Sequence, residues 1–171
     1  MNNPAAMTSI IAIDPGASGG IATCRAGRYD CCPLPDTQGD LVDYLREIRF
    51  ADDIEHADSI VILEQVGGFA GVGRPGSAMF KFGEGYGFLK GVIQALKFKL
   101  VMVRPQTWQK VFGLGTASHC ASKTIWKNKL LAEAQRRFPG LKITLATADA
   151  LLLLEYWMLE HPKPTLSFPP S

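Results

Sequence analysis

The sequence has few cysteines and no long apolar run, and both shortages exclude classes of protein. The four cysteines among its 171 residues form no CxxC pair and no zinc-binding spacing with the three histidines. The longest apolar runs, Ser59 to Leu63 and Ala150 to Leu154, are far too short to cross a bilayer. The N-terminus has neither the basic start nor the apolar stretch of a signal peptide. We therefore expect free thiols, no membrane segment and a cytoplasmic or equally reducing location.

Acidic residues are scarce in the middle of the chain. The net charge of +2 hides this, because residues 1–80 carry five Lys or Arg against 11 Asp or Glu, whereas residues 81–142 carry 12 against two. Lysine and arginine displace counterions from phosphates, so a polyanion partner would account for the basic segment. A solvated surface that is basic for solubility is the alternative, and charge alone does not decide between them.

Short β-branched apolar segments predict a sheet. Ser9 to Ile13 is typical of a buried strand and ends at the turn signal Asp14-Pro15-Gly16. Two more strands follow through short Gly-containing links, which predicts an antiparallel meander. The apolar run Ser59 to Leu63 is typical of a strand buried on both faces. The expected strands are residues 9–13, 20–23, 28–32, 59–63 and 100–103.

Helical patterns fill the remaining intervals. Leu41, Leu45 and Ile48 lie at i, i+4 and i+7, which predicts an amphipathic helix. Residues 67–76 hold five glycines and one proline, which predicts a loop, and further glycines weaken the helix after it. The expected helices are residues 37–49, 78–97, 107–112, 123–138 and 148–160. We therefore predict one α/β domain over residues 1–171, with a mixed five-stranded sheet (a meander plus parallel strands) flanked by helices and irregular tails at 1–8 and 162–171.

Two acidic residues follow predicted strands directly. Asp14 comes after the first strand and Glu64 after the fourth. If these strands are parallel neighbours, about 4.8 Å apart, both carboxylates project into the crevice at their C-terminal edge. Carboxylates held this close repel one another unless a cation lies between them, and oxygen ligands favour Mg²⁺ or Mn²⁺. Each acid alone is equally compatible with an ordinary turn or surface residue.

A third acid, Asp149, begins the last predicted helix in an otherwise apolar stretch. A carboxylate there is costly to bury unpaired. It could interact with the free N–H groups of the helix start. Alternatively, it completes a metal site with Asp14 and Glu64, and the combination of two strand ends and one helix start favours this second interpretation.

Five segments, in the same order along the chain, resemble RuvC-type Holliday junction resolvases, and the third resembles phage and chloroplast members in particular. Together they span most of residues 9–157. The segments are Ile11-Ala-Ile-Asp-Pro-Gly-Ala-Ser-Gly-Gly20, Leu63-Glu-Gln-Val66, Gly85-Tyr-Gly87 with Gly91, Val103-Arg-Pro-Gln-Thr-Trp108 with Gly113-Leu114, and Ala148-Asp-Ala-Leu-Leu152.

The resemblance implies a ribonuclease-H-like fold and a homodimer that nicks opposing strands of a four-way DNA junction at two Mg²⁺-dependent sites. Asp14, Glu64 and Asp149 match the family's acidic cluster, which usually has a fourth Asp or His three or four residues before the last acid. This chain has Leu145 and Ala146 there. That departure leaves either a three-carboxylate site or a weakened enzyme. The mechanism expected is two-metal hydrolysis, with ions about 4 Å apart that activate a water and stabilise the leaving oxygen.

Several residues are candidates for contact with DNA. Phe69, in the glycine-rich loop, could stack on a base or fold back onto the core. Lys123, at the start of a basic helix, could contact the cut strand. Trp108 and Trp126 fit the core better than a stacking platform. The remaining candidates, expected to bind the phosphate backbone, are Arg74, Lys81, Arg104, Lys110 and Lys127.

Three alternatives to a junction endonuclease are open. A catalytically silent DNA-binding protein of the same fold would fit Ala146, and a nuclease acting on flaps or RNA–DNA hybrids would fit the same acids. An actin-like phosphotransferase would fit Asp14-Pro-Gly, but it needs a second similar domain for which 171 residues leave no room.

The glycines at 83, 87 and 91 could allow two helices to approach closely in a dimer, or could reflect packing on the sheet.

Overall fold

The computed structural model describes residues 9–51, 59–67 and 76–162. Its centre is a five-stranded sheet with strand order β3-β2-β1-β4-β5. The strands are β1 (Ser9–Asp14), β2 (Gly20–Arg25), β3 (Arg28–Pro33), β4 (Ile60–Glu64) and β5 (Lys99–Val103). The first three form the antiparallel meander, while β4 lies parallel to both β1 and β5. The predicted mixed α/β sheet is confirmed.

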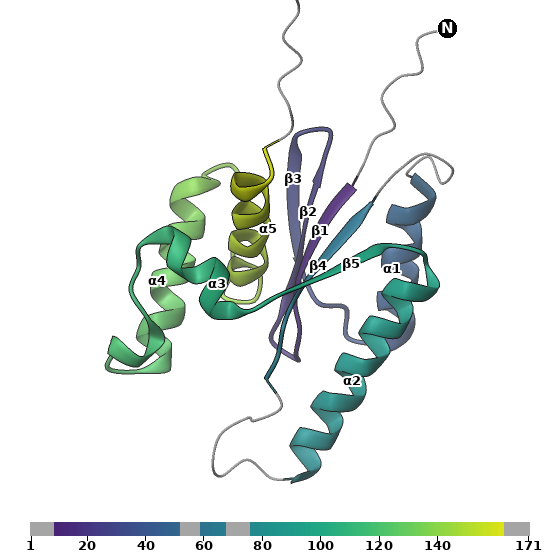
Figure 1. Cartoon of the computed structure of the whole chain (residues 1–171), viewed down its shortest axis with the longest axis horizontal. Coiled ribbons are helices and arrows are strands. Elements are labelled where there is room, and N and C mark those ends of the chain that lie inside the picture. The colour runs from purple at the N-terminus through teal and green to yellow at the C-terminus, as the bar shows by residue number, and fades with distance from the viewer. Residues whose placement is uncertain (1–8, 52–58, 68–75, 163–171) are drawn as a thin grey trace, which may run out of the picture.

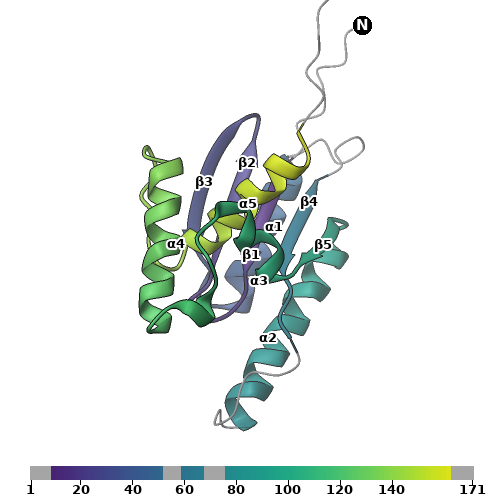
Figure 2. The ribbon, with the colours of Figure 1, turned by 60° about the vertical axis from the view of Figure 1, so that its left-hand side comes forward.

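Five α-helices cover the two faces of the sheet in the described part of the chain. They are α1 (Gln38–Ala51), α2 (Gly76–Ala95), α3 (Pro105–Gln109), α4 (Lys123–Arg137) and α5 (Ala148–Glu160). Figures 1 and 2 show α1 and α2 on one side of the sheet and α3, α4 and α5 on the other. Each predicted strand and helix is present, with ends within two residues of those expected when the 3₁₀ turn Lys110–Phe112 is counted with α3; a second short 3₁₀ turn, Ala117–His119, has no counterpart among the predicted elements.

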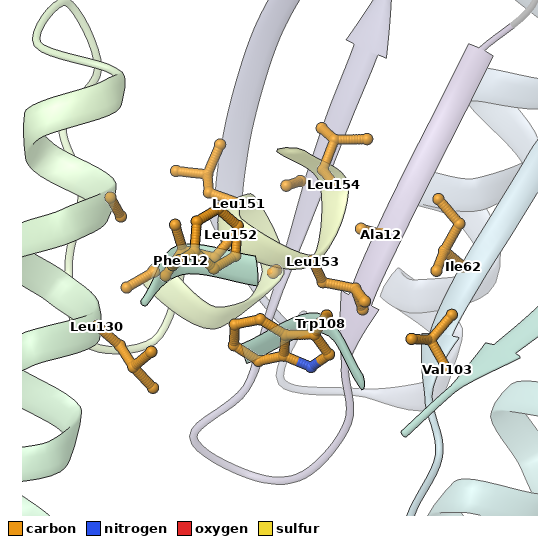
Figure 3. Close-up of a cluster of buried hydrophobic side chains, with 14 of the residues drawn as sticks. Ala12, Ile62, Val103, Trp108, Phe112, Leu130, Leu151, Leu152, Leu153 and Leu154 are labelled. Atoms are coloured by element: carbon orange, nitrogen blue, oxygen red, sulfur yellow. The ribbon is translucent and has the colours of Figure 1, made fainter. Parts of the chain in front are cut away.

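The sheet separates two hydrophobic clusters because strand side chains alternate between its faces. Ile11 and Ile13 of β1 pack with α1 and α2, whereas Ile10 and Ala12 face α3, α4 and α5. The central helix of the second layer is α5, whose residues Leu151 to Leu154 are all fully buried. A helix that is apolar on every side must lie between other elements, and α5 lies between the sheet and α4 (Figure 3).

The strand directions bring several element ends to one edge of the sheet. β1 and β4 both finish at this edge, and α4 and α5 both start there, as does α2 (Figure 1). The chain reaches the edge through glycines that admit no side chain. A Cβ on Gly19 would lie 2.0 Å from the carbonyl oxygen of Asp14, and one on Gly20 would lie 2.4 Å from that of Ala146. The β1–β2 turn and the segment before α5 are therefore packed backbone to backbone.

None of the helices among the described residues is both long enough and apolar enough to cross a membrane. The four cysteines, Cys24, Cys31, Cys32 and Cys120, are all free thiols.

Candidate active site

Strand register places Asp14 and Glu64 next to each other. Ile13 is paired with Leu63 in the parallel β1–β4 ladder, so the following residues, Asp14 and Glu64, occupy equivalent positions at the two strand ends. Because side chains alternate, both carboxylates lie on the face of Ala12 and Ile62, which is covered by α3, α4 and α5. The sequence-based expectation that these two strands are parallel neighbours is confirmed.

Asp149 enters the site from the first turn of α5. The helix begins after Thr147, whose hydroxyl accepts a hydrogen bond of 3.0 Å from the Thr144 N–H, so the turn before the helix is fixed. Asp149 is only 4% exposed. Its Oδ1 atom is buried and has no hydrogen-bond partner among the described residues. An unpaired buried carboxylate oxygen is costly, and this one has the chemistry of a ligand for a hard cation.

The other oxygen of Asp149 is bound by a lysine from the neighbouring helix. Lys127 Nζ lies 2.5 Å from Asp149 Oδ2 and 4.0 Å from Asp14 Oδ2. Its helix, α4, starts at the N-cap Ser122, whose hydroxyl accepts from the Ile125 N–H at 3.2 Å. One ammonium group thus links two of the three acids.

Glu64 is held by donors from both layers of helices. The buried Trp108 of α3 donates from Nε1 to Glu64 Oε2 at 2.9 Å. On the opposite face, the hydroxyl of Tyr86 in α2 donates to the Glu64 carbonyl oxygen at 3.2 Å. The carboxylate and the backbone of this residue are therefore each fixed by a separate helix.

The surroundings disfavour the charged form of two carboxylates. Burial, reinforced by the charge of Asp149, raises the pKa of Asp14 from 3.8 to about 7, although Lys127 and Lys123 oppose the rise. Burial and the charge of Asp14 raise the pKa of Glu64 from 4.5 to about 7, against the lowering effect of the Trp108 hydrogen bond. Two neighbouring acids that both resist ionisation indicate a site short of positive charge.

Lys127 supplies some of that positive charge. Burial lowers the pKa of its ammonium, but Asp149, Asp14 and Glu64 outweigh burial and the pKa is raised. Lys127 therefore stays charged at neutral pH and remains the counterion of Asp14, Glu64 and Asp149, which we call the acidic trio. Lys123 lies four residues earlier on α4, on the same helix face, and is exposed to solvent.

The three acids fit a hard divalent cation by chemistry, but their present arrangement is not a finished metal site. In the described ranges, no group of three or more His, Cys, Asp or Glu side chains is gathered closely enough to hold a metal ion. The donor set consists only of carboxylate oxygens, one of which is buried without a partner. Lys127 pairs with Asp149 and approaches Asp14, so a cation bound by the trio would compete with its ammonium.

The other predicted site residues lie farther out or outside the described structure. Phe69 and Arg74 fall in 68–75, which the structure does not describe. Leu145 and Ala146 have hydrocarbon side chains, so neither provides a ligand at the position before Asp149. The exposed basic candidates, spread over α2, the start of α3 and the turn after it, are Lys81, Arg104 and Lys110.

Two contacts of the site were not anticipated from the sequence. Lys127 was grouped with phosphate-binding lysines, but it is an ion-pair partner of Asp149. Trp108 was expected in the core, where it lies, but not as a donor to Glu64. The apolar neighbours of Lys127, Trp126 and Leu130, could have indicated that this lysine lies at the edge of the buried helix face.

Comparisons with known proteins establish the fold. No protein-family model matches the chain, and no curated protein matches its sequence. Among solved structures, it is similar to Thermus thermophilus RuvC in complex with a Holliday junction substrate, with a TM-score of 0.51 at 13% identity over 91% of this chain and 96% of that one. A second Thermus thermophilus RuvC structure gives a TM-score of 0.50 at 15% identity, over 90% and 96%. The chain has the ribonuclease-H-like fold, and within it a structural similarity to RuvC.

Proposed function

We propose that this protein is a divalent-metal-dependent endonuclease that resolves four-way DNA junctions. The observation that carries the proposal is the convergence of Asp14, Glu64 and Asp149 from two strand ends and a helix start on one face of the sheet. The similarity to RuvC supports the choice of DNA junctions, because one of those structures holds a Holliday junction substrate. The free cysteines fit a reducing, DNA-containing compartment such as the cytoplasm.

The three carboxylates are the proposed ligands of Mg²⁺ or Mn²⁺, two ions in each site. When bound, such ions lower the pKa of a water molecule and neutralise charge on the phosphate. Asp149 offers its unpartnered Oδ1, and Trp108 fixes the Glu64 carboxylate. Lys127 keeps the trio partly neutral and, on release from Asp149, would have an ammonium free to bind a phosphate oxygen. Lys123, exposed one turn earlier, is placed to contact the DNA strand.

The exposed lysines and arginines are the proposed contacts to the junction's phosphate backbone. They include Lys81, Arg104 and Lys110, and Arg74, which lies outside the described residues, is proposed for the same role. Phe69, also outside the described residues, is proposed to stack on a base at the open junction. Such contacts position DNA without reading its sequence. Their common signature is salt dependence, since each phosphate neutralised releases a counterion.

A homodimer would provide the two sites needed to cut both strands of a junction. The stripe formed by Gly83, Gly87 and Gly91 on α2 supports this arrangement. All three glycines are exposed, and a Cβ at each position would meet no other atom within 4 Å. Packing of these glycines on the sheet, the alternative left open by the sequence, is therefore wrong, and their surface is available to a second helix.

The deciding experiment is nicking of a labelled four-way junction with and without Mg²⁺, in the parent and in Asp14→Asn. We expect paired nicks that need both the cation and Asp14. Parallel reactions with a flap, an RNA–DNA hybrid and linear duplex test the substrate class. Equal cutting of all four substrates would contradict junction selectivity, and equal rates for parent and variant would contradict the active site.

A silent junction-binding protein is the second candidate. The pairing of Lys127 with Asp149, together with an alanine at position 146, favours it, because both reduce the ligands available to a cation. This candidate predicts junction binding that is unchanged by Mg²⁺ and no nicking under any condition.

A further inference from the structure

The indole of Trp108 lies where it can fix the orientation of the Glu64 side chain. Trp108 is fully buried in the cluster beneath α5, together with Val103, Phe112 and Leu153 (Figure 3). It comes from α3, which follows β5 directly, and β5 pairs in parallel with β4 so that Val103 lies opposite Glu64. The Gln65 N–H also donates to the Val103 carbonyl at 2.7 Å. The end of β4 and the start of α3 are therefore tied together by backbone and side chain.

A buried indole N–H must find an acceptor, and here the acceptor is a carboxylate. The bond from Trp108 Nε1 to Glu64 Oε2 measures 2.9 Å, within the range of a well-formed hydrogen bond. Indole has one donor and no acceptor, so it fixes one carboxylate oxygen and leaves the other unengaged by the ring. The ring itself is held by Phe112, whose centroid is 6.3 Å away in an edge-on arrangement.

We propose that Trp108 is the positioning residue of the site: its indole N–H fixes the rotamer of Glu64 so that Oε1 is presented toward Asp14 and Asp149 as a cation ligand. This inference rests on the proposed metal-binding function. Trp108 would hydrogen-bond to a metal ligand without binding the metal itself, and the loss of such an interaction typically lowers metal affinity about 10–100-fold. Trp108 touches neither the cation nor the DNA, and it acts only through Glu64.

The first test measures the bond itself and needs no metal. The full chain has three tryptophans, so ¹⁵N labelling gives three indole N–H signals, which Trp108→Phe assigns. In Glu64→Gln the Trp108 signal should move upfield, because a neutral amide accepts a weaker hydrogen bond than a carboxylate. The signal of Trp157, in the second half of α5, should not move. A Trp108 signal that stays in place would overturn the proposal.

The second test measures Mg²⁺ affinity by calorimetry in Trp108→Phe. Trp126→Phe is the matched control, since Trp126 is buried in the same cluster and the truncation is identical. We expect a loss of tenfold or more for Trp108→Phe and at most twofold for Trp126→Phe. Equal losses, or parental affinity in a folded Trp108→Phe protein, would overturn the positioning role.

The two tests also separate this inference from the function beneath it. A parent protein that binds no Mg²⁺ or Mn²⁺, yet shows the Trp108 shift in Glu64→Gln, would overturn the proposed function and the ligand-presenting role together, while the hydrogen bond would stand. A parent that binds Mg²⁺ as tightly as Trp108→Phe would overturn the inference alone.

Discussion

The ammonium of Lys127 lies 2.5 Å from Asp149 Oδ2, so the last acid of the trio is neutralised by a lysine from the adjacent helix. The pair joins α4 to α5 at the edge where β1 and β4 end. It is also asymmetric, because the Asp149 side chain is 5% exposed and that of Lys127 is 32% exposed. If the pair is broken, the Lys127 ammonium can be solvated by water, whereas the Asp149 carboxylate stays buried without a counterion.

Lys127→Met should destabilise the cation-free protein by about 3 kcal/mol, because it leaves a buried carboxylate without a counterion. Lys123→Met, an identical change at an exposed position on the same helix, should cost less than about 0.5 kcal/mol. The measurement is the urea midpoint of each variant. In the double variant Lys127→Met/Asp149→Asn, the loss should be smaller than the sum of the single losses. Strictly additive losses would contradict the ion pair.

The stability of the cation-free protein should fall as the pH rises from about 4 to about 7. Asp14 and Glu64 have folded-state pKa values of about 7, raised above 3.8 and 4.5. The folded state therefore holds protons that the unfolded chain has released, and the stabilisation present at low pH is lost through this range. For Asp14 it amounts to about 4 kcal/mol at most, since one pKa unit corresponds to about 1.4 kcal/mol.

Melting temperatures between pH 4 and 8, in the presence of a chelator, check this dependence. Asp14→Asn removes one of the titrating groups and relieves the repulsion on Glu64, so its curve should be flatter and higher above pH 7. Parallel curves for parent and variant would show that Asp14 ionises freely in the folded protein.

A second buried ion-pair network should matter for stability. Arg137 donates to Glu133 at 2.6 Å and to Glu155 at 3.1 Å, and its guanidinium lies 4.7 Å from the centroid of the Phe112 ring. Arg137→Met should cost about 2–4 kcal/mol because both partners are largely buried. Arg136 also binds Glu133 but is 66% exposed, so Arg136→Met is the matched control and should cost much less. Chemical denaturation that ranks the two variants equally would be the contrary result.

Gly20 should tolerate no side chain. A Cβ there would lie 2.4 Å from the Ala146 carbonyl oxygen, so either β2 or the segment leading to Asp149 must move. We expect Gly20→Ala to lose about 3 kcal/mol or to fail to fold. Gly85→Ala, on an exposed part of α2 outside the Gly83, Gly87 and Gly91 stripe, meets nothing and should gain up to about 1 kcal/mol from helix propensity. Thermal melts of both variants test the contrast, and a Gly20→Ala protein as stable as the parent would contradict the close packing.

The sequence was sufficient to predict most of the fold because its signals are local. Apolar β-branched runs, helical spacing and Gly or Pro punctuation predict each strand and helix to within two residues, with the 3₁₀ turn Lys110–Phe112 counted as part of α3. The meeting of Asp14 with Glu64 followed from one further assumption, that β1 and β4 are parallel neighbours. Alternation along the strands then places both side chains on one face.

The partners of these acids depend on tertiary packing, which local patterns do not carry. The apolar neighbours of Lys127 indicate that it lies at the edge of a buried helix face, but not that it faces Asp149, because that depends on how α4 lies over α5. Likewise, burial of Trp108 was predictable from its type, but its acceptor was not, since α3 reaches Glu64 only through the pairing of β5 with β4. Phe69 and Arg74 remain predictions, because they lie outside the described residues.

The most direct test of the central claim is anomalous diffraction from crystals soaked in Mn²⁺. The claim is that Asp14, Glu64 and Asp149 bind a divalent cation. It predicts a manganese peak bound by oxygens of all three residues, with the Lys127 ammonium displaced from Asp149, and no such peak in Asp149→Asn crystals. Parent crystals at saturating Mn²⁺ that show no peak among these carboxylates, and an intact Lys127–Asp149 pair, would contradict it.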